Sequence, residues 1–304
     1  MIRSDWHYSR TLSIRVMFWC AWWGGTTVSG QPYLDILNAG HVSSPERLAR
    51  WEVGVNVPMN LDPLGTLFVI SPSFEQWEIA PREDPMHNSV TNGSEVLTGY
   101  LLPLTYVRTL GSRGWKMAIT AIGRYMAVEA PHRADYQMGG AIVASRVMRP
   151  TLTWKFGAYA NADAFGFFML PLLGVDWRIS DRHNLFGMLP GNLTYEHKTT
   201  SWLHLGVVYK AITTSFGTRA GDFRRVEENT VGLFADLYAV GKLVVRFEGG
   251  HTALSRYRGG MLDPWYPPIG DGKYVDHNIG DGTYARLGIA YRVRLDTVRA
   301  SERR

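Results

Sequence analysis

His87 and Ser89 in the stretch MHNSVTNG have the residue types and the spacing of a general base and a nucleophile. Nucleophilic catalysis needs a base within hydrogen-bond reach of the hydroxyl, a group that orients the base, such as Asn92, and a donor for the oxyanion. The pair lies in a stretch rich in Pro, Asp and Asn, and a chain with nine histidines produces such triplets by chance. We therefore expect no catalytic activity and keep His87 and Ser89 as the candidates to test.

Oxygen donors for a cation occur in IGDGKYVDHNIGDGTY, residues 269–284, at Asp271, Asp276 and Asp281. A calcium loop spaces its ligands more closely and ends in a bidentate Glu, which this segment lacks, so a glycine-rich loop is the simpler interpretation. The stretch GTRAGDFRR lacks the Lys-Ser/Thr pair of a phosphate loop. Zinc-ligand spacing is absent among the histidines at His183, His197, His204 and His251. We expect neither a metal nor a cofactor.

The first thirty residues have the composition of a secretory signal. Three arginines precede an apolar run over residues 16–25, and small residues follow at 28–30, which is the order of a signal that is cleaved near Gly30. The apolar run is too short to span a membrane, and a buried N-terminal helix or strand is the alternative. Cys20, the only cysteine, lies in this segment, so the exported chain needs no disulfide.

The composition of the chain favours β-structure. Only 19% of the 304 residues are charged, whereas glycine occurs 32 times and aromatic residues make up 12%. This composition suits strands that are joined by tight turns. The net charge of +5 is small and dispersed along the chain, which argues against nucleic acid as a partner.

A period of two dominates the chain from Trp51 onward, and no helical pattern of comparable length competes with it. In GVDWRIS, residues 174–180, the valine, tryptophan and isoleucine lie on one side of an extended strand, and Asp176 and Arg178 lie on the other. Many such segments reach ten residues, the length of a tilted strand that crosses a bilayer. The sequence predicts twelve of them, at about 51–60, 66–79, 96–110, 115–127, 137–148, 151–161, 168–180, 184–196, 202–214, 229–238, 242–255 and 283–294.

This alternation fits two kinds of protein. In a soluble sandwich the apolar face packs in a core, whereas in a membrane barrel it faces lipid and the polar face lines the lumen. The export signal and the strand lengths favour the barrel, as do aromatic residues near strand ends, which resemble interfacial girdles: Trp51, Trp77, Trp115, Tyr125, Trp177, Trp202, Tyr238 and Tyr291. Charges of both signs would then pair in the lumen, from Glu52, Lys116, Arg124, Lys155, Asp176, Arg178, Glu196, Asp236, Arg246, Glu248, Arg286 and Arg292.

The lengths of the connections support the barrel and leave the strand number open. From the N-terminus they alternate between short and long, as in barrels with tight turns on one side of the membrane and longer loops on the other. The alternation fails at HKTTS, residues 197–201, and at AVG, residues 239–241. We expect an all-β, antiparallel, up-and-down transmembrane β-barrel of about 12 strands, with a count open by about two.

From Trp51 to Arg294 the chain resembles the outer-membrane β-barrels of Gram-negative bacteria. The run LPLLGVDWRIS...LFGMLP...LTYEH is similar to a family of such barrels without an assigned activity. The resemblance implies an outer-membrane location, with membrane lipid and the barrel-assembly machinery as partners. RLGIAYRV matches the C-terminal signal that this machinery recognises, but the chain continues through RLDTVRASERR; the matching residues are Arg286, Gly288, Tyr291 and Val293.

These features predict a signal peptide at 1–30, an N-terminal lead at 31–50, a barrel at 51–295 and a solvated basic tail at 296–304. The function we expect is that of a narrow pore for a small solute or of a structural envelope protein, without catalytic activity. About twelve strands place the lumen between that of filled eight-stranded barrels and that of open porins. The alternatives are an outer-membrane lipid hydrolase that uses His87 and Ser89, and a soluble secreted β-sandwich or lipocalin-like carrier.

Overall fold

The computed structural model describes residues 32–44, 48–61, 66–80, 95–111, 114–128, 135–218, 222–261, 275–278 and 281–294. The strands are β1 (Tyr33–Ser44), β2 (Leu48–Val55), β3 (Val57–Asn60), β4 (Leu67–Ile70), β5 (Ser73–Ile79), β6 (Glu95–Leu110), β7 (Trp115–Ala127), β8 (Tyr136–Arg149), β9 (Leu152–Asp163), β10 (Gly166–Arg178), β11 (His183–Leu189), β12 (Asn192–Lys198), β13 (Leu203–Gly217), β14 (Asp222–Val240), β15 (Leu243–Met261), β16 (Val275–Asn278) and β17 (Gly282–Arg294). Within the described residues, no helix has the length and apolar character needed to cross a membrane.

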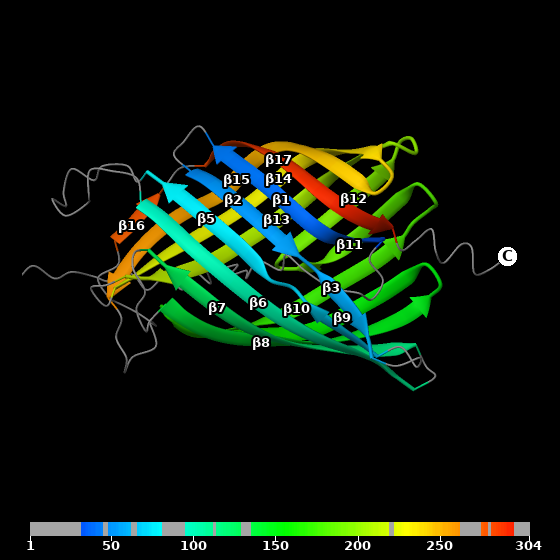
Figure 1. Ribbon diagram of the computed structural model, residues 1–304, viewed down its shortest axis with the longest axis horizontal. Coiled ribbons are helices and arrows are strands. Elements are labelled where there is room, and N and C mark those ends of the chain that lie inside the picture. The colour runs from blue at the N-terminus through cyan, green and yellow to red at the C-terminus, as the bar shows by residue number, and fades with distance from the viewer. Residues whose placement is uncertain are drawn as a thin grey trace, which may run out of the picture.

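These segments form one closed antiparallel barrel of 14 strands (Figure 1). β3 continues β2 and β4 leads into β5, since β2 pairs with β5 and β3 pairs with β4. β16 and β17 likewise both pair with β15. The barrel closes where β1 pairs with β17, from Tyr33 opposite Arg294 to Ser43 opposite Ala285. The expected class of a closed antiparallel β-barrel is confirmed.

The barrel has 14 strands rather than about 12, at the upper limit of the expected range, because two features were not recognised in the sequence. β1 lies in the segment expected to be a lead, and its register with β17 shifts between Asp35 and Leu37, an irregularity that breaks the period of two. The segment 184–196 contains two strands, β11 and β12, which a turn at residues 190–191 separates. The barrel therefore begins with β1 rather than at residue 51.

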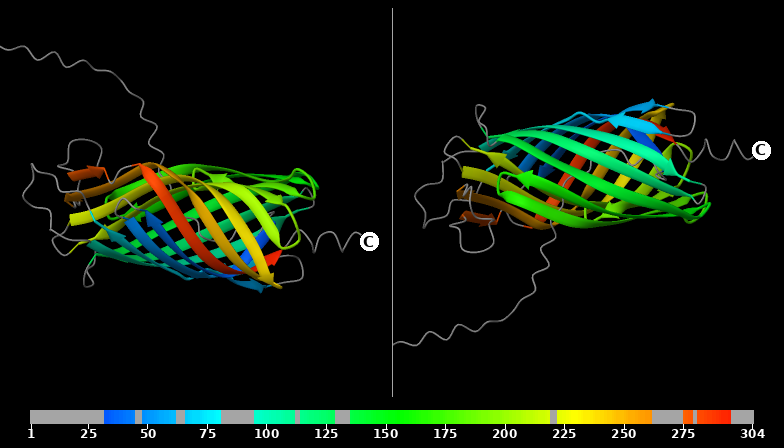
Figure 2. Two further views of the ribbon diagram at one scale, coloured as in Figure 1. Left: turned by 90° about the horizontal axis from the view of Figure 1, so that it is seen from above. Right: turned by 90° about the horizontal axis from the view of Figure 1, so that it is seen from below.

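With the two corrections, the three longest connections, at residues 80–94, 128–135 and 262–274, lie at the same end of the barrel. The connections at one end of the barrel, called here the short-turn end, comprise residues 61–66, 111–114, 150–151, 179–182, 199–202 and 241–242. Those at the opposite, long-loop end comprise residues 45–47, 80–94, 128–135, 164–165, 190–191, 218–221 and 262–274. β1 starts and β17 ends at the short-turn end, and Figure 2 shows the same wall from two further sides. Both segments at which the alternation failed now lie at the short-turn end.

Apolar side chains face outward from the wall and charged side chains face inward, the reverse of a soluble protein. In the stretch GVDWRIS, Asp176 is 5% exposed and Trp177 is 43% exposed. Phe167 and Leu233 are 70% and 68% exposed, whereas Asp236 is fully buried. A row of aromatic rings crosses the outer face of β5 to β8 with neighbouring centroids 5.2, 6.1 and 5.2 Å apart, formed by Phe74, Tyr100, Tyr125 and Tyr136.

Apolar side chains from opposite walls meet in the interior toward the long-loop end, at Leu48, Trp77, Ile79, Leu97, Leu101, Met126, Ile212, Phe216, Val226 and Tyr257. Residues 211–217 of β13 are all buried, so both faces of this half-strand are covered. The amide of Val128 donates to the carbonyl oxygen of Gly217 at 3.2 Å, and Gly217 forms a parallel bridge with Ala127 of β7. This half of β13 stays paired with β14, while its other edge turns toward the interior and reaches β7 at Gly217.

Candidate functional site

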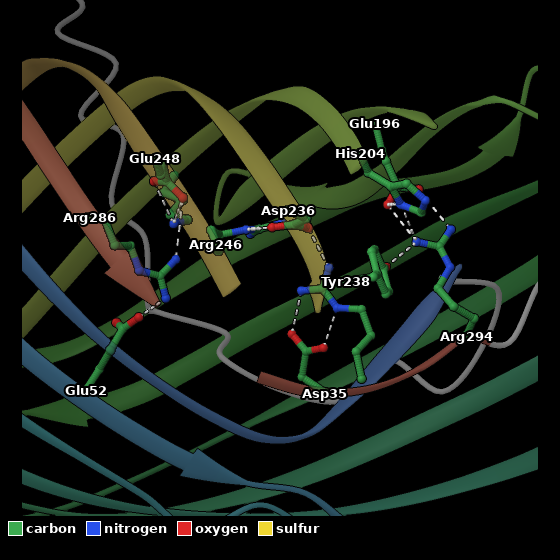
Figure 3. Close-up of polar contacts among 12 residues, drawn as sticks. Asp35, Glu52, Glu196, His204, Asp236, Tyr238, Arg246, Glu248, Arg286 and Arg294 are labelled. Atoms are coloured by element: carbon green, nitrogen blue, oxygen red, sulfur yellow. Dashed lines mark hydrogen bonds and ion pairs between the residues drawn. The ribbon is translucent and has the colours of Figure 1, made fainter. Parts of the chain in front are cut away.

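The interior toward the short-turn end holds charged side chains that are joined into chains of ion pairs (Figure 3). Asp236 on β14 lies at the centre of one chain. Arg246 on β15 donates to both of its carboxylate oxygens, at 2.6 and 2.7 Å. Arg292 on β17 donates to Asp236 at 2.5 Å and to Asp35 on β1 at 2.6 and 2.9 Å. Four strands on both sides of the closure between β1 and β17 are thus connected through side chains.

A second chain of charges is centred on Glu248 of β15. Lys210 on β13 donates to its two oxygens at 2.9 and 3.0 Å, and the hydroxyl of Tyr284 donates at 3.0 Å. Arg286 on β17 lies between Glu248, at 3.5 Å, and Glu52 on β2, with which it forms an ion pair. The carboxylates and cations alternate, so each charge has a neighbour of opposite sign.

A third group surrounds Glu196 on β12, which is fully buried. Arg294 at the end of β17 donates to both of its oxygens, at 2.7 and 3.0 Å, and also to the hydroxyl of Tyr238 at 3.0 Å. The side-chain amide of Asn184 donates to Glu196 at 2.8 Å, and His204 Nδ1 lies 3.2 Å from it. This carboxylate therefore holds β11, β12, β13 and the last wall strand together.

The opposite wall carries separate pairs. Lys155 on β9 lies 2.7 Å from Asp176 on β10, and both side chains are at most 3% exposed. Arg124 on β7 lies 3.3 Å from Asp163 on β9. Between these pairs the inner face is apolar, with a cluster formed by Ile122, Ala141, Val143, Tyr159, Leu172 and Met188. We call the side of the interior around this cluster the apolar half, although buried polar side chains such as Thr120 and Asn161 also lie there, and the side with the three networks the charged half.

The structure places ten of the twelve residues expected in the lumen within these interior networks: Glu52, Arg124, Lys155, Asp176, Glu196, Asp236, Arg246, Glu248, Arg286 and Arg292. Lys116 and Arg178 lie near the short-turn end and are partly exposed. The sequence did not single out the partners Asp35, Asp163, His204, Lys210 and Arg294. Asp35 lies in the unrecognised strand. The other four partners occupy positions that alternate inward along their strands, and this alternation is the signal that would have indicated them.

The other candidate residues lie apart from the networks or outside the described part of the chain. His87, Ser89, Asn92 and Asp271, the segment 1–30 and the tail 296–304 fall outside the described residues. Asp281 is exposed. Of the four residues of the C-terminal signal, Arg286 is the one that joins the interior charges, whereas Tyr291 is 44% exposed on the outside. The rings of His183 and His197 lie tilted against each other with centroids 4.5 Å apart, and no cluster of three metal-ligating side chains occurs among the described residues.

Comparison with known proteins shows a weak similarity to porins. No family model matches the chain, and no curated protein matches it. Among solved structures, a multiple mutant of the Rhodopseudomonas blastica porin aligns over 84% of this chain and 98% of its own, with a TM-score of 0.28 and 10% identity. A triple mutant of the same porin aligns over the same shares, with a TM-score of 0.27 and 9% identity. The barrel described above is established by the strand pairings of this chain itself.

Proposed function

We propose that this protein is an outer-membrane β-barrel that provides a narrow passage for small solutes. Paired charges and the buried residues 211–217 of β13 keep this passage nearly closed. The observation that carries the proposal is the inversion of faces. Side chains such as Phe167 and Leu233 are more than two-thirds exposed, while carboxylates such as Asp236 are fully buried. An apolar exterior around a polar interior suits a barrel in lipid.

Two further observations support the orientation and the location in a membrane. The row of aromatic rings from Phe74 to Tyr136 lies on the outer face, where aromatic girdles occur at the edges of a bilayer. Both ends of the described barrel chain lie at the short-turn end, which in outer-membrane barrels faces the periplasm. The short-turn end of this barrel would therefore be periplasmic.

The interior argues for a narrow passage rather than a wide one. Charged groups of strands that are not adjacent touch in the charged half, as Arg294 of β17 and Glu196 of β12 do, and an apolar cluster occupies the interior toward the long-loop end. A barrel of 14 strands with these contents leaves far less room than an open porin of 16 strands. Small ions could pass beside the paired charges, whereas large solutes could not.

Planar-bilayer recording tests this proposal. We expect the purified protein to give conductance steps much smaller than those of an open porin. Replacing Glu52 and Arg286 together by alanine removes a neutral pair from the interior and should enlarge the steps, while Asp181→Asn at an exposed turn should not. Heat-modifiable gel mobility shows that the purified barrel is folded. If neither the folded wild type nor the folded double variant gives conductance steps, the protein is a structural envelope protein instead.

Two of the alternatives from the sequence do not fit the described strands. A β-sandwich is wrong, because the described strands form one closed wall. A lipocalin-like carrier would need an apolar cavity, whereas half of this interior is charged. The lipid hydrolase stays a prediction, since His87 and Ser89 lie outside the described residues. Unchanged lipid hydrolysis by the Ser89→Ala variant would contradict it.

A further inference from the structure

The hydrogen-bonded wall is incomplete beside the hairpin of β11 and β12, which is shorter than its neighbours. β11 pairs with β10 only from Leu173 to Arg178, so residues 166–172 of β10 extend beyond it toward the long-loop end. β12 pairs with β13 only as far as Lys210, so residues 211–217 of β13 extend beyond it as well. Figure 1 shows both short strands confined to the half of the barrel near the short-turn end. We call the interval between residues 166–172 and residues 211–217 the seam.

Hydrogen bonds close the seam at its two ends but not along its length. On the side nearer the short-turn end, the amide of Ala211 donates to the carbonyl oxygen of Gly191 at 2.8 Å. On the side nearer the long-loop end, the amide of Ala164 donates to the hydroxyl of Ser215 at 3.1 Å, and that hydroxyl donates to Asp163 at 3.1 Å. Between these points the described residues form no ladder from β10 to β13.

The β10 edge of the seam has the composition of a strand edge. Pro171 lies in the middle of it and contributes no N–H, and proline within sheets is confined to such edges, to first positions and to bulges. Backbone groups that face hydrocarbon without partners are costly, so membrane barrels normally leave no open edge. Side chains rather than backbone hydrogen bonds must therefore fill this part of the wall.

The seam joins two apolar surfaces. On the outer face of β10, Phe167 and Met169 are 70% and 66% exposed. On its inner face, Phe168 and Leu170 pack against the apolar cluster that includes Leu172. The nearest interior charges form ion pairs, Lys155 with Asp176 and Arg124 with Asp163. The seam therefore lies between the lipid-facing surface and the apolar half of the interior, and the charges named here are paired.

We propose that the seam admits the acyl chain of a lipid from the adjoining leaflet into the apolar half of the barrel. The proposal rests on the proposed membrane location, because lipid is then what lies against Phe167 and Met169. An acyl chain is long, narrow and apolar, so it suits the apolar side chains that border the seam on both faces of β10, and Pro171 leaves no N–H to satisfy at the middle of that edge. It would cover the edge of β10 and lie against Phe168, Leu170 and Leu172, while solutes pass through the charged half.

Site-directed spin labelling in liposomes tests the proposal. The background is Cys20→Ser, which removes the only cysteine, and single cysteines replace Leu170 at the seam, Met169 on the outer face and Val143. Val143 is the matched control, because it is buried on the inner face of β8, whose two edges are both paired. Collisions with oxygen report contact with lipid, and collisions with a water-soluble nickel chelate report contact with water.

We expect the label at position 170 to be nearly as accessible to oxygen as the label at position 169, and that at position 143 to be several-fold less accessible. Low oxygen accessibility at 170, or accessibility to the nickel chelate, would overturn the acyl-chain proposal while the result at 169 still supported a membrane barrel. Low oxygen accessibility at 169 would instead contradict the membrane location. If the variant at 170 loses its heat-modifiable mobility, Leu172→Cys replaces it with the same two outcomes.

Discussion

Asp236 joins two guanidinium groups inside the barrel and so links β14 to β15 and to β17. Its carboxylate accepts from Arg246 and from Arg292, and the guanidinium of Arg292 also lies 3.7 Å from the centre of the Tyr33 ring. Ionised groups at full burial are costly unless each has a partner. Asp236 therefore contributes little net attraction to the stability of the barrel, whereas its removal would be strongly destabilising because buried guanidinium groups would lose their counter-charge.

The first prediction concerns this carboxylate. Asp236→Asn leaves two buried guanidinium groups without their shared charge, and breaking a buried pair in this way costs about 3–5 kcal/mol. We expect the urea midpoint of the detergent-solubilised barrel, followed by loss of its heat-modifiable mobility, to fall strongly. Asp181→Asn, at an exposed turn, should leave the midpoint unchanged. A midpoint of Asp236→Asn equal to wild type would mean that the charge network does not hold the wall.

The sequence predicts these charges more readily than their partners. Alternation along a single strand is a local property, and it identified Asp236 and Arg246, which are cross-strand neighbours in one hairpin. The partner Asp35 is 257 positions away from Arg292. That pair exists only because β1 closes on β17, so no local pattern could have indicated it.

At the scale of the elements, the hairpin of β11 and β12 depends on a close approach at Gly187. This residue has a φ of +147°, and a Cβ atom placed there would lie 2.5 Å from the carbonyl oxygen of Asn192. A side chain would be strained in its backbone and would also collide with the neighbouring strand. The hairpin borders the seam on the side nearer the short-turn end, so its geometry also sets the length of the seam.

The second prediction follows from this contact. Gly187→Ala should destabilise the barrel by about 1–3 kcal/mol, the usual cost of a non-glycine residue in such a conformation. Gly249→Ala is the matched control, because the nearest atom to its added Cβ is 3.8 Å away and its φ is not positive. Urea midpoints of the two variants should differ clearly. Equal midpoints would show that β11 relaxes without cost.

The sequence indicated most strands and failed where an element departs from regular geometry. Ten-residue alternation identified β6 to β10, because their side chains alternate between buried and exposed along most of each strand. β1 was missed because its bulge reverses the parity between Asp35 and Leu37. β11 and β12 were merged because both are short and the turn between them was read as part of one strand. Residues 211–217 of β13 have both faces buried. No pattern in the sequence indicates this burial, because it depends on the tertiary structure.

At the scale of the whole molecule, the barrel is closed toward its long-loop end by its own wall. Residues 211–217 of β13 lie inside, and the side chain of Gln137 on β8 donates to the carbonyl oxygen of Ser215 at 2.8 Å. With the bridge from Gly217 to Ala127, these bonds join strands that are far apart around the wall. We therefore expect that passage through this end requires β13 to move away from β7.

The last prediction tests that movement with cysteines at Ala127 and Gly217 in the Cys20→Ser background. Bridged strands lie about 4.8 Å apart, within the Cα separation that a disulfide spans, so oxidation should join β7 to β13. In planar bilayers we expect the oxidised protein to show fewer or smaller conductance steps than the reduced protein, and reduction should restore them. The single variant Gly217→Cys should respond to neither treatment. Failure of the disulfide to form would contradict the contact between the strands, whereas a disulfide without effect on conductance would mean that solutes bypass β13 and that the passage runs elsewhere in the interior.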